Sequence, residues 1–464
     1  MQQRKIDNHI TETTAEQVYT KAGNIRDVLR YLKKFKNSRI VIQLDDKVIY
    51  SPSFPSIIKD ICYIHETGIK ILIVPGAKNR IDEVLTSSNI SWKTHNGIRI
   101  TDPEEMSLIK MAAFDTANIT MTALAGEGKT ALIGNWVKAR AKGIINGVNY
   151  GSSGEIERLN ISAIERVLEE NFIPIFPCVG WNSTGIAYNI LSTSLATELA
   201  IRLSSEKLFF VTSDMLISNT SAETIADSKI PIPAMDLTEV KLYISQLKKI
   251  RNVSRETNQA KDSLTCNLKL QLLTKAYNAC LQGVTRVHII NGSLDGALPC
   301  EIFSGIGSGT MIYKSDYGGI RNMQTNDIPD VLNLMRPFIE KGILLYRNAE
   351  TISSQLNDYI VFEMDGGIKA CASLHIYKDM QAEIAAIAVD KSIFHLGTGP
   401  KLVNYLIARA KEKNCSSVFV LTTQTADWFL QLGFNEDSIE SLPLERKNKW
   451  TPQRGSKVFR ISFK

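Results

Sequence analysis

The sequence predicts an α/β protein of two domains. From Arg39 to about Tyr313, short β-branched runs alternate with helical patterns, which is typical of a mostly parallel sheet with helices on both faces. After the turn-forming string SDYGG at 315–319, a strand and a helix lead into a meander of short strands, which is an α+β order. A chain of 464 residues is also too long for one ordinary hydrophobic core.

The first domain is expected over residues 24–313, after an N-terminal tail at 1–23. Its strands should be RIVIQL, KILIVPG, TALIGN, IPIFPCVG, KLFFVTSD and RVHIING. Ahead of them, the 3.6-residue spacing predicts an amphipathic helix over 24–35. The apolar face of that helix would be formed by Ile25, Val28, Leu29 and Leu32.

The second domain is expected over residues 318–464. IRNM should form a strand that a helix follows, and YIVFEMDGGIKACASLHIYK should form the meander. A further strand begins near Glu383 and ends at Val389, a glycine loop follows it, and the next helix has Leu402, Val403 and Leu406 on one face. Another strand and an aromatic-rich tail complete the domain.

The amino-acid composition argues against nucleic-acid binding, membrane insertion and metal binding. The charge balance, 54 Lys and Arg against 48 Asp and Glu, comes with short and interrupted basic runs, so we expect no nucleic-acid partner. No apolar run approaches the roughly 20 residues that span a bilayer, and the N-terminal segment resembles no targeting signal, so a cytoplasmic protein is expected. Seven scattered cysteines without a CxxC pair indicate reduced thiols and no metal site.

The sharpest local pattern is a strand, a glycine loop and a helix over residues 383–412. Glycines let a backbone approach a pyrophosphate, whose charge is met by free amides and the positive end of the helix dipole. Two glycines alone would equally suit a tight turn. The candidate cofactor-binding residues are Ile387, Ala388, Val389, His395, Leu396, Gly397, Thr398, Gly399 and Pro400.

This arrangement resembles the CoA-binding motif of the GNAT acetyltransferase superfamily. The loop of that motif normally opens on Gln or Arg, whereas Phe394 stands there in this sequence. The segments GILLYRNAETI, VFVLTTQTADWFLQLGF and PQRGSKVF further resemble the GNAT domain of bacterial N-acetylglutamate synthases. The resemblance implies acetyl transfer from acetyl-CoA to the α-amine of L-glutamate, the first step of arginine biosynthesis.

The same resemblance implies catalytic roles. The ammonium of glutamate must lose a proton before it attacks the thioester, and Glu383 matches the position of the family's base. A main-chain amide near Ile387 or Ala388 would stabilise the developing oxyanion. Thr422 matches a Ser or Thr proposed to protonate the leaving thiolate, although a threonine at a strand end is also ordinary β chemistry.

Substrate recognition should depend on arginine, whose planar fork pairs with carboxylates. Arg347 and Arg454 match arginines of the family motifs, and Lys457 is a weaker third candidate. Trp428 and Phe429 would either wall the pantetheine end of the CoA site or pack in the core.

The first domain resembles the amino-acid-kinase fold, especially acetylglutamate kinase, through HNGIRITD, GWNSTGIAYNILSTSLATELAIRL and GVTRVHIINGSLDGALPCEIF. Kinases of that family need Lys-x-Gly-Gly after the first strand and a second glycine cluster. Here QLDD at 43–46 and VPGA at 74–77 stand in those places. Two carboxylates oppose phosphoryl transfer, so we expect an amino-acid-kinase-like sandwich that is catalytically silent and serves regulation and oligomerisation.

Arginine-regulated members of the fold bind arginine beside an N-terminal helix, and this resemblance implies a regulatory site here. Glu301 would pair with the guanidinium, and carbonyls of the glycine turn would meet the amine. The expected site residues are Tyr31, His288, Glu301, Gly307 and Gly309. The resemblance also implies a ring-like homo-oligomer that the N-terminal helix helps to join.

Three alternatives stay open from the sequence. The first is a working acetylglutamate kinase, which the missing lysine and glycines disfavour. The second is a GNAT enzyme for another amine, which the two arginines disfavour. The third is an arginine-binding module with an inactive transferase, which the joint presence of Glu383, Thr422 and the glycine loop disfavours.

Overall fold

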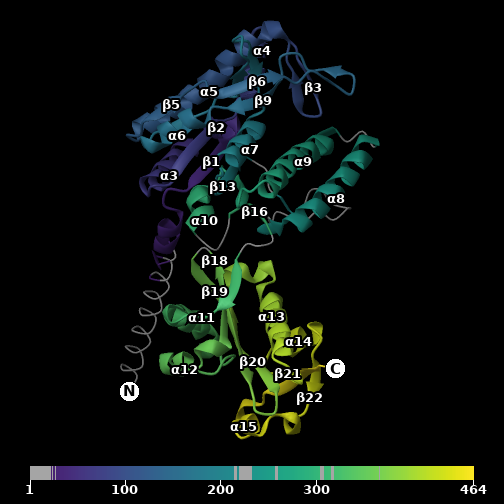
Figure 1. The fold of residues 1–464 in the computed structure, drawn as a ribbon. Helices are drawn as coiled ribbons and strands as arrows, with labels where there is room; N and C mark the ends of the chain where they lie inside the picture. The colour runs from purple at the N-terminus through teal and green to yellow at the C-terminus, as the bar shows by residue number, and fades with distance from the viewer. Residues whose placement is uncertain are drawn as a thin grey trace, which may run out of the picture. The chain divides into compact units, whose positions relative to one another are not determined.

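A computed structural model of the protein describes residues 22, 25–26, 28–213, 217–218, 232–256, 260–303, 308–314, 318–364 and 366–463. The chain folds as two compact units, Met1–Ser315 and Asp316–Lys464. The division falls inside the SDYGG string. Each unit has its own sheets and hydrophobic cores (Figure 1).

The first unit is built on a sheet in which eight strands are described. All neighbouring strands run parallel except β15 and β16, which are antiparallel. The six strands predicted from the sequence all lie in it, and β13 is buried along its whole length, as a strand covered on both faces should be. The strand order is β14 (Ala234–Asp236), β16 (Thr310–Tyr313), β15 (Arg286–Asn291), β13 (Lys207–Thr212), β1 (Arg39–Leu44), β2 (Lys70–Pro75), β10 (Ile173–Ile175) and β5 (Ala131–Ile133).

Helices cover both faces of this sheet, which confirms the predicted doubly covered α/β architecture. Side chains alternate along each strand, so Phe210 belongs to one core and Phe209 to the other. The helices are α2 (Asp46–Ile49), α3 (Phe54–Glu66), α4 (Lys78–Ser87), α5 (Met106–Gly126), α6 (Ile161–Glu169), α7 (Ser192–Arg202), α8 (Leu237–Glu256), α9 (Ala260–Leu281) and α10 (Ala297–Phe303). Figure 1 shows α8 and α9 side by side as a long helical pair.

The first unit also contains smaller β elements that were not predicted from the sequence. One sheet has the order β12 (Ala187–Asn189), β11 (Val179–Trp181), β6 (Val137–Ala141) and β9 (Gly154–Leu159). Two hairpins are formed by β3 (Lys93–His95) with β4 (Ile98–Ile100) and by β7 (Ile144–Ile145) with β8 (Val148–Asn149). Helix α5 contacts β12 of the four-stranded sheet.

The N-terminal helix packs through a different face from the one predicted. Residues 28–35 are helical, and the buried side chains are Tyr31 and Phe35. Ile25 and Leu29, expected on the buried face, are each 59% exposed. The two aromatic rings contact each other in a tilted arrangement with centroids 4.2 Å apart. They bury more area than the aliphatic side chains would, which explains the choice of face.

The second unit has a seven-stranded mixed sheet in its described part, and it confirms the predicted α+β order. The strand order is β17 (Gly319–Asn322), β18 (Tyr359–Met364), β19 (Gly367–Ile376), β20 (Gln381–Val389), β21 (Ser417–Thr422), β23 (Lys457–Ser462) and β22 (Asn435–Asp437). The helices are α11 (Ile328–Glu340), α12 (Ala349–Ser354), α13 (Thr398–Glu412), α14 (Ala426–Gln431) and α15 (Leu444–Lys447). Short 3-10 turns include η4 (Lys391–Leu396) and η6 (Pro452–Arg454).

Of the helices that the structure describes, none combines the length and apolar character needed to cross a membrane.

Candidate active site

Strands β20 and β21 separate in the middle of the second sheet. They pair in parallel over Gln381–Glu383 and Ser417–Phe419, whereas β20 stays paired with β19 as far as Val389. The pairing with β19 shifts register near Cys371, and Ala386 has a φ of 53° at that point. Such a bulge breaks the regular hydrogen-bonding pattern. The irregularity therefore lies where the sequence placed the oxyanion amide of Ile387 or Ala388.

The glycine loop joins β20 to α13. Gly397 is the N-cap of the helix and has a φ of 62°, a left-handed conformation that glycine adopts without strain. It has no side chain to cap the helix, and Pro400 has no amide hydrogen, so the first-turn amides of Thr398 and Gly399 face outward from the helix start. His395 and Leu396 lie in the backbone of η4. The helix start therefore has the form of an anion site.

Trp428 and Phe429 have different surroundings. A Cβ added at Gly399 would lie 3.1 Å from Cζ2 of Trp428, so the half-buried indole packs directly over the glycine. Phe429 is buried, and its ring lies 5.5 Å from that of Phe434. Trp428 therefore borders the loop, while Phe429 belongs to the core.

Glu383 is at the centre of a buried polar cluster. Arg446 Nε donates to both carboxylate oxygens, at 3.0 and 2.8 Å. The Tyr377 hydroxyl donates to Oε2 at 2.7 Å. The side chains of Glu383 and Arg446 are only 8% and 14% exposed. Burial and the charge of Glu383 raise the pKa of Tyr377, so its hydroxyl stays protonated and donates.

The guanidinium of Arg454 lies within electrostatic reach of those of Arg446 and Arg347. Arg454 Nη2 donates to the carbonyl of Ile343 at 2.9 Å, which ties the PQRGSK segment to the GILLYR segment. Burial lowers the pKa of Arg454, and the charges of Arg446 and Arg347 lower it further. The structure thus brings together the two arginines predicted from the sequence and adds Arg446, which the sequence reasoning missed.

The remaining two candidates differ in their surroundings. Thr422 Oγ1 accepts the amides of Gln424 at 3.3 Å and Thr425 at 3.0 Å, and it lies 2.8 Å from the Thr425 hydroxyl. With both lone pairs accepting amides, the Thr422 hydroxyl donates its hydrogen to that of Thr425. Lys457 Nζ forms an ion pair with Glu436 at 3.1 Å, and both side chains are exposed.

A histidine that the sequence reasoning did not select lies opposite Glu383 on β19. His375 Nδ1 is 2.7 Å from Asp358 Oδ2, and its Nε2 is 3.1 Å from the Ser373 hydroxyl. A carboxylate bonded to one ring nitrogen fixes the tautomer and orientation of an imidazole. Because directly opposed residues share one face of an antiparallel pair, this dyad lies on the Glu383 side of the sheet.

In the first unit, the predicted regulatory residues cluster around Glu301. His288 Nδ1 contacts Glu301 Oε1 at 2.8 Å, and the amides of Ser308 and Gly309 donate to Oε2 at 2.7 and 3.1 Å. Burial lowers the pKa of His288 to about 4, so the ring is neutral and its Nδ1–H donates. Burial alone would raise the pKa of Glu301, but these three donors lower it. Gly307 lies outside the described residues.

Tyr31 joins this region through Phe303 of α10, whose ring it meets edge-on at 5.0 Å. Beside it lies a buried cation that the sequence reasoning missed: Lys207 Nζ is 4.8 Å from the Tyr31 ring centroid. Arg286, the cross-strand neighbour of Lys207, is also buried. Lys207 lies within an otherwise apolar strand, so the hydrophobic pattern of the sequence gives no sign that this lysine is buried beside Tyr31.

The two aspartates in the predicted kinase position bind backbone amides. Asp45 caps α2 through the amide of Lys47. Asp46 accepts the amides of Asn79 and Arg80 and the Asn79 side-chain amide at the start of α4. A carboxylate of the chain itself therefore occupies the anion site at that helix start.

Comparisons with known proteins agree with this division. The amino acid kinase family matches residues 38–291, and the acetyltransferase (GNAT) family matches residues 328–434. The amino-acid acetyltransferase of Vibrio atlanticus is 31% identical over 443 residues, which cover 93% of this chain and 96% of the relative. That of Photobacterium profundum is 33% identical over 438 residues, which cover 92% and 95%.

Solved structures give the same result. The N-acetylglutamate synthase from Neisseria gonorrhoeae, complexed with coenzyme A and L-arginine, is 25% identical with a TM-score of 0.74, and the match covers 95% of this chain and 99% of that one. A structure of the same synthase with coenzyme A and N-acetyl-glutamate matches with a TM-score of 0.57, covering 96% and 99%. This chain therefore belongs to the amino-acid acetyltransferase family, the N-acetylglutamate synthases in which an amino-acid-kinase domain precedes a GNAT domain.

Proposed function

We propose that the second unit transfers the acetyl group of acetyl-CoA to the α-amine of L-glutamate at the opening between β20 and β21. The observation that carries this proposal is the group of three guanidiniums, Arg347, Arg446 and Arg454. Glu383 balances the charge of Arg446. A substrate with two carboxylates would supply negative charge to the other two arginines.

Glu383 is the proposed base. Its Oε1 accepts one described hydrogen bond, from Arg446, and still has a lone pair for a water that takes the proton from the ammonium. When a substrate carboxylate approaches Arg446, it competes with Glu383 for the guanidinium. His375, held by Asp358, is an alternative acceptor on the same face.

The other groups complete the reaction. The amide of Ile387 or Ala388 at the bulge would stabilise the oxyanion, and Thr422 would donate its hydrogen to the departing thiolate. The Thr398 and Gly399 amides would bind the CoA pyrophosphate, with Trp428 beside them. Lys457 remains the weaker substrate candidate, because Glu436 already pairs with it.

A panel of amines tests the substrate. The purified chain is mixed with acetyl-CoA and either L-glutamate, L-glutamine or L-lysine, and thiol release is followed. We expect L-glutamate to react fastest, since only its side chain carries a second carboxylate for the arginine group. Equal or faster release with L-glutamine or L-lysine would overturn the assignment.

For the first unit, we propose a silent kinase-like domain that binds L-arginine near Glu301. The support is that Asp46 fills the anion site at the start of α4 and that Glu301 is a buried, ionised carboxylate. Both Glu301 oxygens already accept bonds, so a guanidinium has to share them or displace a donor. Thiol release is measured with and without L-arginine, and phosphorylation of N-acetylglutamate by ATP is measured in parallel. Phosphorylation of N-acetylglutamate would contradict the assignment as a silent kinase. Thiol release that L-arginine does not change would contradict the arginine site.

We also propose that the chain assembles as a homo-oligomer through its N-terminal helix. Ile25 and Leu29 expose apolar surface there, which a second copy would cover. Light scattering of the protein and of an Ile25→Glu, Leu29→Glu variant tests this. A variant with an unchanged mass would exclude this face.

A further inference from the structure

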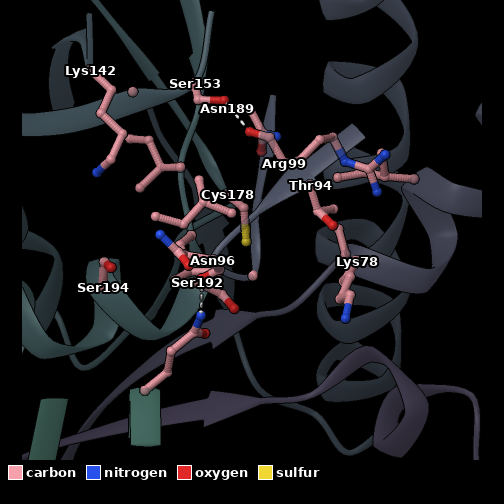
Figure 2. A pocket seen from close by; sticks show the side chains of 18 of the residues that line it. Lys78, Thr94, Asn96, Arg99, Lys142, Ser153, Cys178, Asn189, Ser192 and Ser194 are labelled. Atoms are coloured by element: carbon pink, nitrogen blue, oxygen red, sulfur yellow. Dashed lines mark hydrogen bonds between the residues drawn. The ribbon is translucent and has the colours of Figure 1, made fainter. Parts of the chain in front are cut away.

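A cavity of about 310 Å³ lies in the first unit at the start of α6. Its walls come from the segment that follows β5, from β6 and β9, and from the first residues of α6. The cavity in Figure 2, which Lys78, Arg99 and Lys142 help to line, shares no lining residue with it. These two cavities are therefore distinct, and the one at α6 has no part in the functions proposed above.

Two cations that line the α6 cavity lie directly opposite each other. Lys138 of β6 pairs with Arg158 of β9 in the antiparallel register, so their Cβ atoms are about 5 Å apart and their side chains leave the same face. Like charges in opposed positions are destabilising. No Asp or Glu is among the described lining residues, and within the described part of the chain neither cation takes part in an ion pair.

The carboxylates of β9 do not neutralise these two cations. The pairing of β6 with β9 shifts register between Lys138 and Ala139, which leaves Glu157 as the extra residue of a β-bulge. Glu157 is exposed and does not line the cavity. The other carboxylate of the strand, Glu155, pairs with Lys142 at 3.3 Å. The β6–β9 pair therefore brings positive charge to the cavity without an ion-pair partner for it.

Side-chain amides add neutral donors to the cavity. Asn160 is the N-cap of α6, and its Oδ1 accepts from the Ala163 amide at 3.4 Å and from the Ser162 hydroxyl at 3.2 Å. The helix start is thus capped by its own residue. The NH₂ groups of Asn135 and Asn160 have no acceptor among the described residues, so both can donate to a ligand.

Trp136 forms a fixed apolar wall of the cavity. Its half-buried indole lies 5.0 Å from the ring of Phe176. It also covers Gly134, where any Cβ would overlap the indole ring. The Trp136 carbonyl accepts the amide of Asn160 at 2.9 Å, which ties this segment to the start of α6. The indole is therefore held in one orientation beside the two cations.

We propose that this cavity binds a phosphate dianion, either inorganic phosphate or the phosphate of a small monoester. A phosphate group carries a charge of about −1.5 to −2 at pH 7 and several acceptor oxygens, so it can pair with Lys138 and Arg158 at once and remove their mutual repulsion. A monocarboxylate carries one charge and balances only one of them. Phosphate binding here does not require the acetyl transfer proposed above, because the cavity and the transferase residues belong to different units.

Isothermal titration of the full chain with inorganic phosphate tests the site. The test variant carries Lys138→Gln and Arg158→Gln. The control variant carries Lys110→Gln and Arg166→Gln, an exposed lysine and an exposed arginine of the same unit that do not line the cavity. Other anion sites contribute equally to all three proteins. We expect one binding component to weaken by about tenfold or more in the test variant alone, since each substitution removes a hydrogen bond from a charged donor.

Two single variants check the charge argument without removing both cations. Lys138→Arg keeps the positive charge and should retain the binding component. Glu157→Gln removes a carboxylate next to Arg158 and leaves the lining unchanged, so it should tighten phosphate binding. Loss of the component in Lys138→Arg, or unchanged or weaker binding in Glu157→Gln, would contradict the electrostatic basis of the site.

The remaining outcomes decide the ligand class. Identical isotherms for the wild type and the test variant would overturn the site, and an equal loss in the control variant would overturn it as well. Acetate that binds the same component as tightly as phosphate would overturn the preference for a dianion. Glycerol 3-phosphate distinguishes the two sources of the dianion: tighter binding than inorganic phosphate assigns a monoester, and weaker binding assigns free phosphate.

Discussion

The buried Glu383–Arg446 pair allows chemistry and folding to be separated in one variant. Glu383→Gln replaces the carboxylate by a neutral amide of the same shape, so the proposed base is lost while Tyr377 and Arg446 keep a hydrogen-bonding neighbour. The Glu383 side chain is only 8% exposed, so water cannot replace it freely. Its loss should therefore affect both the proposed proton transfer and the stability of the folded state.

Two magnitudes follow from the structure. Loss of a positioned base lowers kcat by about 10²- to 10⁴-fold. A hydrogen bond to a charged group contributes about 1.5–3 kcal/mol, and glutamine retains part of the bonding, so the unfolding free energy should fall by about 2 kcal/mol. The KM for acetyl-CoA should stay nearly constant, since Glu383 acts in the chemical step and not in cofactor binding.

The assay combines thiol release at saturating substrates with urea unfolding. Glu363→Gln is the matched control, because Glu363 also pairs with an arginine, Arg321, at 2.7 Å in the same unit and has no proposed catalytic role. The control should keep its kcat. If Glu383→Gln keeps at least half of the wild-type kcat, the base assignment is refuted and His375 becomes the candidate to replace. A kcat loss matched by the control would make the effect structural.

Four further changes have defined outcomes. Arg454→Ala should raise the glutamate KM by about 10- to 100-fold, as loss of a charged hydrogen bond implies, and an unaltered KM in steady-state kinetics would dismiss this residue. Gly399→Val would force branched atoms against Trp428, 3.1 Å from the Cβ position, so acetyl-CoA binding measured by calorimetry should weaken, with Gly399→Ala milder. His288 has a pKa near 4 in the folded state and near 6.5 in the unfolded state. Between these values the unfolded state binds more protons, so the unfolding free energy should fall by roughly 3 kcal/mol as the pH drops from 6.5 to 4. In His288→Gln this dependence of the unfolding free energy on pH should shrink. Asp46→Ala should lower the unfolding free energy by about 1–2 kcal/mol, the usual effect of losing a helix cap, and leave thiol release unchanged.

Sequence patterns revealed the parts of the fold that depend on local periodicity. Five of the six predicted strands of the first sheet are largely buried, so they read as continuous apolar runs. The sixth, β5, lies at the edge of the sheet and exposes Leu132. Helix α13 buries Leu402, Val403 and Leu406 as its spacing predicts. The N-terminal helix was misjudged because two faces were available and tertiary packing of Tyr31 and Phe35 decided between them. Helix propensity alone does not show which face of a helix packs against the rest of the domain.

The polar networks could not be read from the sequence, because their members are brought together only by the fold. Arg446 and Glu383 are 63 residues apart in the chain, and Arg446 lies on a four-residue helix without a strong pattern. The register of β19 against β20 places His375 beside Glu383. In the same way, one cavity of the first unit is lined by cations that come from α4, the β3–β4 hairpin, the β6–β9 sheet region and α9, namely Lys78, Arg99, Lys142 and Lys275.

The start of α4 gives the physical reason to expect no phosphoryl transfer in the first unit. Asp46 satisfies the amides of Asn79 and Arg80, so a phosphate arriving there would meet a carboxylate and occupied donors. Phosphoryl transfer depends on positioning and on neutralising negative charge, and a carboxylate at the helix start opposes both. The same contacts tie α2 to α4, so the carboxylate that opposes kinase chemistry also contributes to the packing of the unit.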